Sequence, residues 1–273
     1  MPDVSTATES PEEADDSTLL APDEPAPFTL VNPAGKTPLL LFCDHATRFL
    51  PRALGTLGLT EAVLSRHIAW DIGIAEVTGN LAMRLDAPAV LSHFSRLAID
   101  PNRKLDDPTL VQRLSDGVII PGNRDLSPAD LKARIDGLYR PYHAAIDRML
   151  EDLLARGPAP AVISMHSFTP VIKGTERPWQ VGILWNEDPR LPVPLMAGLR
   201  AQGIAVGDNQ PYSGRDQHGH SLHLHAGARG LANALVEVRQ DLIDTHRGAA
   251  EWAERLADAL SAVLADPAIF RSA

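Results

Sequence analysis

The sequence predicts an α/β protein with three layers, in which helices cover both faces of a mostly parallel or mixed central sheet. Three observations support this fold class. Short apolar runs alternate with helical patterns along the chain, and no internal repeat is present. The run at residues 38–43 is continuously apolar, as expected of a strand that is covered on both faces. The 273 residues are 44% hydrophobic and 22% charged, and we expect them to form one folded domain after a short tail.

We expect residues 1–27 to form a disordered acidic tail and residues 28–273 to form the domain. Residues 1–35 contain eight Asp or Glu and no Lys or Arg, so they account for most of the net charge of −10. They are also rich in Ser, Thr and Pro, and such a composition buries too little apolar surface to fold. The remainder of the chain is therefore nearly neutral.

The composition also limits which binding partners and which cellular location are expected. The nearly neutral domain offers no basic tract, so we do not expect nucleic acid to bind. No apolar run reaches about 18 residues, so no membrane span is predicted. The N-terminus lacks the pattern of a secretory signal, and the single Cys43 excludes an intramolecular disulfide. Together these features favour a cytoplasmic protein, whose oligomeric state is left open.

The expected elements follow one another in a regular order. Strands are predicted at residues 38–43, 89–91, 161–166, 180–185, 204–206 and 233–239, with residues 28–31 as a first strand or an edge clamp. Helices are predicted at residues 60–66, 71–85, 127–156 with an interruption at Pro141, 194–202 and 245–264. Residues 104–126 and 213–229 are predicted to be loops, and loops of this length are usually functional.

Four side chains at or near the ends of these elements suggest a metal site. His45, His166 and Glu237 belong to strand ends, and Asp71 stands at a helix start. A catalytic zinc site needs three protein ligands and one open position, where the metal lowers the pKa of bound water to about 7. His45, Asp71 and His166 could be those ligands, with Glu237 as the acid or base.

A structural role explains the same residues when each is taken alone. A histidine at a strand end is more often hydrogen-bonded than metal-bound, and Asp71 would be favoured at a helix start by the helix dipole. The sequence contains no HExxH and no CxxC motif. His67 lies four residues before Asp71 and could share a metal with it, although we expect it to orient its neighbours.

Two further groups of residues are candidates for substrate binding. Arg96, Asn102 and Arg103 could bind a carboxylate, because the planar guanidinium matches its two oxygens. The alternative is a surface ion-pair cluster with Asp100 and other nearby aspartates. The loop at residues 213–229 contains four histidines, which suggest a metal-binding tract or an active-site loop with one functional member.

The ordered set of motifs resembles the N-formylglutamate amidohydrolase family. The matching segments are residues 43–47, 67–73, 95–103, 139–143, 164–170, 209–212 and 235–242. The resemblance implies a phosphorylase/hydrolase-like fold and hydrolysis of the N-formyl amide of a carboxylate-bearing amino acid such as N-formyl-L-glutamate. The products would be formate and the amino acid, and the usual setting is histidine degradation. The implied cofactor is Zn²⁺ or another divalent metal such as Mn²⁺ or Co²⁺.

The resemblance also implies roles for single residues. The family is similar in layout to zinc-dependent aspartoacylases, carboxypeptidases and cell-wall amidases. In the amidases, a strand-end histidine, a helix-start acid and a second strand-end histidine hold zinc, and a glutamate on a late strand is catalytic. These positions correspond to His45, Asp71, His166 and Glu237.

Other residues follow from the same comparison. The Asp-Pro-Asn-Arg run at residues 100–103 resembles the Asp-Leu-Asn-Arg of aspartoacylases, which implies that Arg103, with Asn102, holds a substrate carboxylate. The aspartoacylase motif His-x-x-Glu is absent here, so we expect Asp71 to be the acidic ligand, with Asp44 as the alternative. Arg96 or His225 would stabilise the oxyanion.

Rival functions stay open on the sequence. One is a related zinc deacylase or carboxypeptidase-like hydrolase that acts on another N-acyl amino acid. A cell-wall amidase is disfavoured by the missing signal sequence. Another is a non-catalytic binding protein of the same fold, against which the joint presence of four site residues argues. The expected partner is in each case a small N-acyl amino acid.

Overall fold

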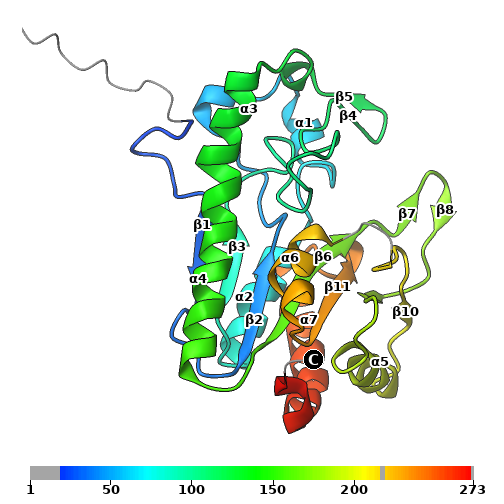
Figure 1. The fold of residues 1–273 in the computed structure, drawn as a ribbon. Coiled ribbons are helices and arrows are strands. Elements are labelled where there is room, and N and C mark those ends of the chain that lie inside the picture. Colours follow the sequence, from blue (N-terminus) through cyan, green and yellow to red (C-terminus); the bar gives the residue numbers. More distant parts are fainter. Residues whose placement is uncertain (1–18, 216–218, 272–273) are drawn as a thin grey trace, which may run out of the picture.

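The computed structural model describes residues 19–215 and 219–271, which are built around one mixed seven-stranded sheet (Figure 1). In spatial order the strands are β1 (Phe28–Val31), β3 (Ala89–Ser92), β2 (Leu39–Cys43), β6 (Ala161–Phe168), β11 (Asn233–Arg239), β9 (Val181–Leu184) and β10 (Val206–Asp208). Neighbours β3, β2, β6 and β11 are parallel, and so are β9 and β10. β1 pairs with β3, and β9 with β11, in the antiparallel sense. The predicted fold class is confirmed.

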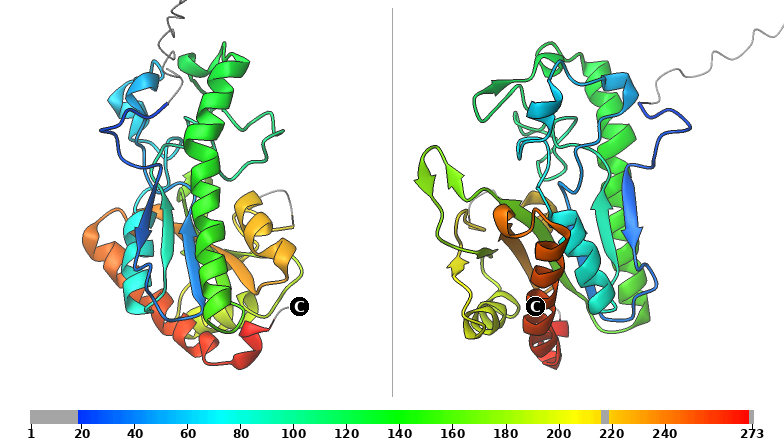
Figure 2. Two further views of the ribbon diagram at one scale, coloured as in Figure 1. Left: turned by 60° about the vertical axis from the view of Figure 1, so that its left-hand side comes forward. Right: turned by 180° about the vertical axis from the view of Figure 1, so that it is seen from behind.

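Helices cover both faces of the sheet (Figure 2). One face packs against α2 (Ile74–Arg84), α5 (Pro192–Ala201) and α7 (His246–Leu264), and the other against α4 (Arg140–Arg156) and α6 (His220–His225). Strand β2 shows why both faces need cover. Its residues are all buried, with Leu39, Leu41 and Cys43 in one core and the alternate Leu40 and Phe42 in the other.

The predicted long helix is divided by a π-helical turn. It begins as α3 (Pro128–Arg134), continues through a π turn at Ile135–Tyr139, and becomes α4. Ser127 and Asp130 form a capping box at its start, as their spacing suggests. The expected interruption at Pro141 takes the form of this π turn, which precedes the proline whose backbone cannot donate a hydrogen bond.

Three shorter elements lie outside the seven-stranded sheet. They are α1 (Glu61–Leu64), the hairpin of β4 (Leu114–Ser115) and β5 (Val118–Ile119), and the hairpin of β7 (Val171–Ile172) and β8 (Thr175–Glu176). The expectation that residues 213–229 form an irregular loop is wrong for part of this segment, because α6 lies within it. The buried Leu222 of α6 packs into the sheet-covering core, which favours a helix there.

The N-terminal segment divides at residue 19. Residues 1–18 lie outside the described part, so the expected disorder is not tested there. Residues 19–27, which the sequence assigns to the same tail, lie against the fold. Leu19 is buried beside Gly137, and the Glu24 carboxylate accepts a hydrogen bond from the backbone N–H of Arg52 at 2.7 Å. Among the described helices, none has the length and apolar character needed to cross a membrane.

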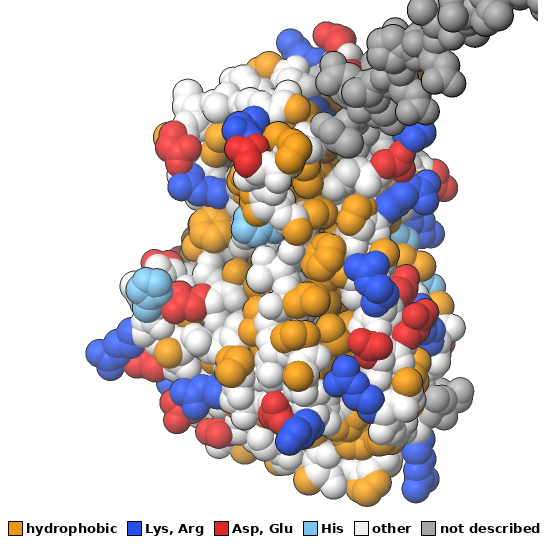
Figure 3. All heavy atoms as spheres, turned by 90° about the vertical axis from the view of Figure 1, so that its left-hand side faces the viewer, with side chains coloured by type: hydrophobic (Ala, Val, Ile, Leu, Met, Phe, Trp, Pro, Cys, Tyr) orange, Lys and Arg blue, Asp and Glu red, His pale blue; other side chains and the backbone are white. Residues whose placement is uncertain are grey.

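Figure 3 shows the face of the molecule near β1, where apolar side chains form a band down the middle and charged side chains lie mostly on either side of it. β1 is the edge strand of the sheet and pairs only with β3 among the described strands. Leu30 in β1 is 41% exposed, so this edge is only partly covered.

Gly73 sets the start of α2, the helix that follows Asp71. Its φ is +80°, and a Cβ there would lie 2.1 Å from the Ile243 carbonyl oxygen. A Cβ at Gly79, within the same helix, would meet no other atom within 4 Å. We expect Gly73→Ala to lower the free energy of unfolding by at least about 1–3 kcal/mol, and the control Gly79→Ala to raise it by about 0.5–1 kcal/mol. Urea titration of both variants measures this, and equal effects would contradict the role of Gly73.

Candidate active site

The parallel strands bring the candidate residues together at the carboxyl ends of the strands. His45 follows β2 by two residues, His166 lies in β6, and Glu237 lies in β11 directly beside His166 in the strand register. Asp71 comes from the segment before α2, and its backbone N–H donates to the His45 carbonyl oxygen at 2.9 Å. Because β2, β6 and β11 are neighbours in the parallel part of the sheet, residues far apart in sequence meet there.

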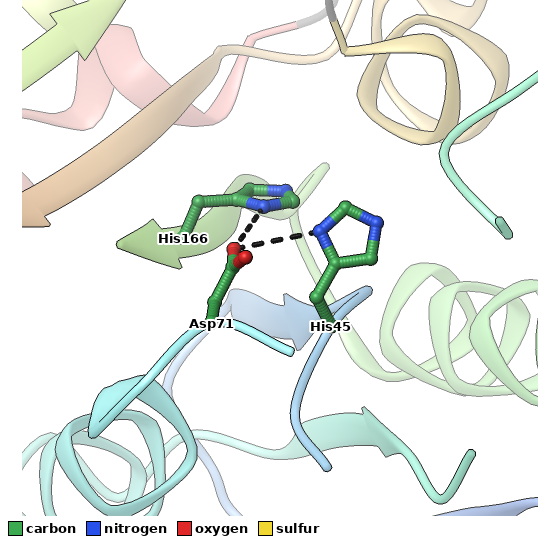
Figure 4. Close-up of side chains that lie close together, drawn as sticks. All are labelled: His45, Asp71 and His166. Carbon is green, nitrogen blue, oxygen red and sulfur yellow. Dashed lines mark hydrogen bonds and ion pairs between the residues drawn. The ribbon is translucent and has the colours of Figure 1, made fainter. Parts of the chain in front are cut away.

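Two histidines face one carboxylate at the centre of the site (Figure 4). The Asp71 Oδ2 atom lies 2.9 Å from His166 Nδ1 and 3.4 Å from His45 Nδ1. One donor atom from each residue lies within 4.8 Å of the others, and all three side chains are buried. Two imidazole nitrogens and a carboxylate oxygen form a donor set that zinc prefers.

The far nitrogen of each imidazole faces a second carboxylate. His45 Nε2 lies 2.7 Å from Asp100 Oδ1, and His166 Nε2 lies 3.3 Å from Asp44 Oδ2 and 3.1 Å from Ser164 Oγ. With Nε2 held by these contacts, the Nδ1 atom of each ring faces Asp71. Carboxylates behind the histidines orient metal ligands in this way.

This arrangement decides between the two acidic residues considered for the centre. Asp71 lies on the side of the histidines where their Nδ1 atoms converge, whereas Asp44 lies behind His166. The hydroxyl of Tyr142 donates to Asp44 Oδ1 at 3.0 Å and holds that carboxylate in place. The geometry therefore favours Asp71 over Asp44 as the acidic member of the cluster.

The electrostatics of the cluster favour positive charge. Burial and Arg96 oppose protonation of His45, but Asp100 and Asp71 outweigh them and raise its pKa. Burial likewise opposes protonation of His166, yet its contacts with Asp44 and Asp71 raise its pKa to about 10. Although burial disfavours the ionised form of Asp71, the two histidines hold its pKa well below the usual range. A bound divalent cation would supply the positive charge that these carboxylates favour.

Unpartnered buried atoms also fit a cation. His45 Nδ1 and Glu237 Oε2 are buried and make no hydrogen bond. Such atoms are costly to bury unless a partner satisfies them. The chemistry and placement of the donors fit a divalent metal at the His45–Asp71–His166 cluster, with Glu237 beside it.

Glu237 has the electrostatic properties of an acid–base group. It is buried, and burial raises its pKa to about 7, although the nearby His166 opposes this shift and Asp71 adds to it. A carboxyl with a pKa near neutral exchanges protons readily in both directions at neutral pH. The carboxyl faces the cavity that contains the cluster.

A cavity of about 190 Å³ gathers seven of the eight residues proposed from the sequence. These are His45, Asp71, Arg96, Asn102, Arg103, His166 and Glu237. Apart from His67, the remaining wall comes from residues that the sequence did not single out by chemistry, among them Phe168, Thr169, Ile172 and Tyr212. Tyr212 falls within the matching segment 209–212, and Phe168 and Thr169 fall within 164–170. The family motifs could therefore have indicated these three residues.

Two half-buried arginines surround one buried aspartate. Asp100 is fully buried, and its Oδ2 lies 3.0 Å from Arg96 Nη2 and 3.9 Å from Arg103 Nε. Arg96 also approaches Asp71 Oδ1 at 3.5 Å. The alternative of a surface ion-pair cluster does not describe this site, because Asp100 is inside the protein. Arg103 Nε is buried without a hydrogen-bond partner, so the guanidinium keeps capacity to bind a ligand.

His225 does not reach the cavity, contrary to the expectation that it stabilises an oxyanion. It is fully buried in α6, with Nε2 2.7 Å from His143 Nδ1 and Nδ1 3.0 Å from Asp147 Oδ1. Both ring nitrogens are thus engaged, since α6 turns this side chain toward α4. His67 does line the cavity but lies outside the three-residue cluster, and its Nε2 is 3.8 Å from Asp116 Oδ2.

Fold and site together define a class of protein: an α/β protein with a candidate metal centre at the carboxyl edge of a mixed sheet, as metal-dependent hydrolases have. The sequence model of the N-formylglutamate amidohydrolase family matches residues 37–244. The chain therefore belongs to this family of amidohydrolases, as the motifs of its sequence suggested.

Solved structures share this fold. Gene product Atu2144 of Agrobacterium tumefaciens is 37% identical, with a TM-score of 0.85 over 90% of this chain and 99% of that one. The N-formylglutamate amidohydrolase of Ralstonia eutropha JMP134 is 23% identical, with a TM-score of 0.70 over 87% of this chain and 97% of that one, and shows the same fold. No curated protein sequence matches the chain.

Asp100 offers a test of the cluster that leaves its three donor residues intact. Asp100→Asn removes the charge behind His45, and we expect the affinity for Zn²⁺ to fall by roughly 10–100-fold, as for other residues that orient ligands. Competition with a chromophoric chelator measures the affinity, and circular dichroism establishes that the variant is folded. Asp106→Asn, which removes an exposed charge nearby, is the control. Equal affinities in the two variants would refute the orienting role.

Proposed function

We propose that the protein is a metal-dependent amidohydrolase that cleaves the N-formyl amide of a carboxylate-bearing amino acid, such as N-formyl-L-glutamate. The products would be formate and the free amino acid. The observation that carries this proposal is the buried Glu237 carboxyl beside the His45–Asp71–His166 cluster, within one cavity of a chain that belongs to this family. A cytoplasmic role in histidine degradation is part of the same proposal, which rests on the family resemblance.

His45, Asp71 and His166 would hold the metal. Zn²⁺ suits two imidazoles and a carboxylate best, and Mn²⁺ or Co²⁺ also accept this donor set. When bound, such a cation polarises the substrate carbonyl and makes water a nucleophile at neutral pH. Asp100 would orient His45 by accepting a hydrogen bond from its Nε2, and Asp44, 3.3 Å from His166 Nε2, would orient His166.

Glu237 would move the protons. Its ionised carboxylate accepts a proton from the attacking water as the new C–O bond forms. The protonated carboxyl then donates that proton to the amide nitrogen as the C–N bond breaks, so the amine leaves neutral. Burial favours the protonated form of this carboxyl, which helps it to retain the proton between the two steps.

The arginines would position the substrate. Arg103, with Asn102 beside it, would bind a substrate carboxylate and hold the amide at the cluster. Fixing the substrate at two points lowers the entropic part of the barrier. Arg96 borders the same cavity and already contacts Asp71 and Asp100, so its charge would stabilise the developing oxyanion.

The role of Glu237 is tested by Glu237→Gln, which keeps the size and removes the proton transfer. With N-formyl-L-glutamate as substrate, we expect kcat to fall by roughly 10²–10⁴-fold while bound zinc stays stoichiometric. Formate release and atomic absorption measure the two quantities. Glu176→Gln, at an exposed position of β8, is the control. If Glu237→Gln turned over nearly as fast as the wild type, the proposed proton transfer would be ruled out. If the turnover of the wild type survived a chelator, the metal would be ruled out.

The carboxylate clamp is tested by Arg103→Lys, which keeps the charge but loses the planar pair of donors. We expect kcat/KM for N-formyl-L-alanine to fall about tenfold or more, since hydrogen bonds to charged groups contribute about 1.5–3 kcal/mol. The α-carboxamide of the same substrate should be cleaved equally by both proteins. A similar loss with the carboxamide would show that Arg103 acts in some other way.

Related reactions share these residues. A deacylase acting on larger N-acyl groups would need the same cluster and the same carboxylate clamp. Rates with N-formyl, N-acetyl and longer N-acyl forms of one amino acid separate the two activities. A non-catalytic binding protein of this fold would show metal and ligand binding without release of formate.

A further inference from the structure

A second and larger cavity adjoins the candidate active site. Its volume is about 700 Å³, whereas the cavity with the cluster measures about 190 Å³. Pockets that enclose drug-sized ligands commonly measure about 300–1,000 Å³, so the smaller cavity alone falls short of that range. The two cavities have five lining residues in common, namely Asn102, Arg103, Leu184, Gly219 and Leu235. They are therefore neighbouring compartments of one site.

One part of the wall of the larger cavity is formed by apolar side chains. Leu184, Leu222, Leu231 and Leu235 are each less than 10% exposed, and all four line it. Trp185 adds an aromatic face, whose orientation is fixed because its Nε1 donates to Asp208 Oδ1 at 2.8 Å. Leucines and one held indole form a surface suited to an apolar or aromatic group.

Several charged groups of this cavity already have a partner. Arg190 Nη2 lies 2.5 Å from Asp188 Oδ2 and donates to the Gly230 carbonyl at 2.8 Å. Asp107 accepts hydrogen bonds from Thr109. The Arg215 guanidinium lies 5.7 Å from the centre of the Trp185 ring, in a cation–π contact. Lys104 and Glu187 also line the cavity, so its apolar wall lies beside charged groups.

The proposed carboxylate clamp at Arg103 would determine which part of a substrate reaches this cavity. Arg103 lines both compartments, with the cluster and Glu237 on one side and the apolar wall on the other. With the scissile amide at the cluster and the α-carboxylate at Arg103, the acyl group stays in the smaller cavity. The side chain of the amino acid then extends past Arg103 toward Trp185 and the leucines.

We propose that the larger cavity is a specificity subsite for a bulky apolar or aromatic amino-acid side chain. The preferred substrates are then N-formyl amino acids of the phenylalanine or leucine class, and glutamate is a poorer fit. This inference rests on the proposed amide hydrolysis for its position beside Arg103. It differs from that proposal because the subsite concerns the side chain and takes no part in the chemistry.

Asn186 allows the subsite to be filled without touching the catalytic residues. It is exposed, lines only the larger cavity, and follows β9 by two residues. Asn186→Trp is compared with Glu151→Trp, which places the same side chain at an exposed position of α4 away from both cavities. The substrates are N-formyl-L-phenylalanine, N-formyl-L-alanine and N-formyl-L-glutamate.

In the wild type we expect kcat/KM for the phenylalanine derivative to exceed that for the other two by at least about tenfold, the scale of discrimination by apolar pockets. Asn186→Trp should remove most of this advantage and leave the alanine derivative within about twofold. Glu151→Trp should behave as the wild type. No preference for phenylalanine in the wild type, or an unchanged preference in Asn186→Trp, would overturn the subsite.

A binding measurement separates the subsite from the reaction. Calorimetric titration of N-formyl-L-phenylalanine into Glu237→Gln, with and without Asn186→Trp, reports occupancy in the absence of turnover. Tight binding that Asn186→Trp weakens at least about tenfold would support the subsite even if the wild type released no formate. Equal binding by both proteins would reject it even if formate release were fast.

Discussion

The constraint on which the site depends is the burial of four carboxylates around two imidazoles. All four lie inside the protein near the carboxyl ends of the central strands, namely Asp44, Asp71, Asp100 and Glu237. Charges without partners are costly to bury, and here the two histidines, together with Arg96, compensate for part of that charge. The raised pKa values of both histidines express the same excess of negative charge, which a divalent cation would balance.

The sheet makes this concentration of charge possible. Parallel pairing of β2, β6 and β11 places residues far apart in the sequence at one edge, and helices on both faces exclude water from the strands. The strands are rigid and apolar, so the polar residues at their ends have few alternative positions. Burial then tunes each group differently: it raises the pKa of Glu237, while ion pairs keep Asp71 ionised.

Sequence reasoning failed where side-chain direction mattered. His225 belongs to a histidine-rich segment that suggested an active-site loop, but a short helix turns its ring toward His143 and Asp147. Helical and loop geometries of such a short segment differ little in pattern, and packing of Leu222 decides between them. Leu19 is a similar case, because an acidic tail can still contribute one apolar residue to a core.

The sequence by itself determined the fold class and the family, and seven of the eight site residues proposed from it line the cavity. It could do so because strand burial, helix periodicity and ordered motifs are local properties of the chain. Only the tertiary structure decided that Asp71 rather than Asp44 faces both histidines, that Asp100 is buried behind His45, and that a larger apolar cavity begins at Arg103. These features depend on distances between segments far apart in sequence, which the packing of helices on the sheet sets.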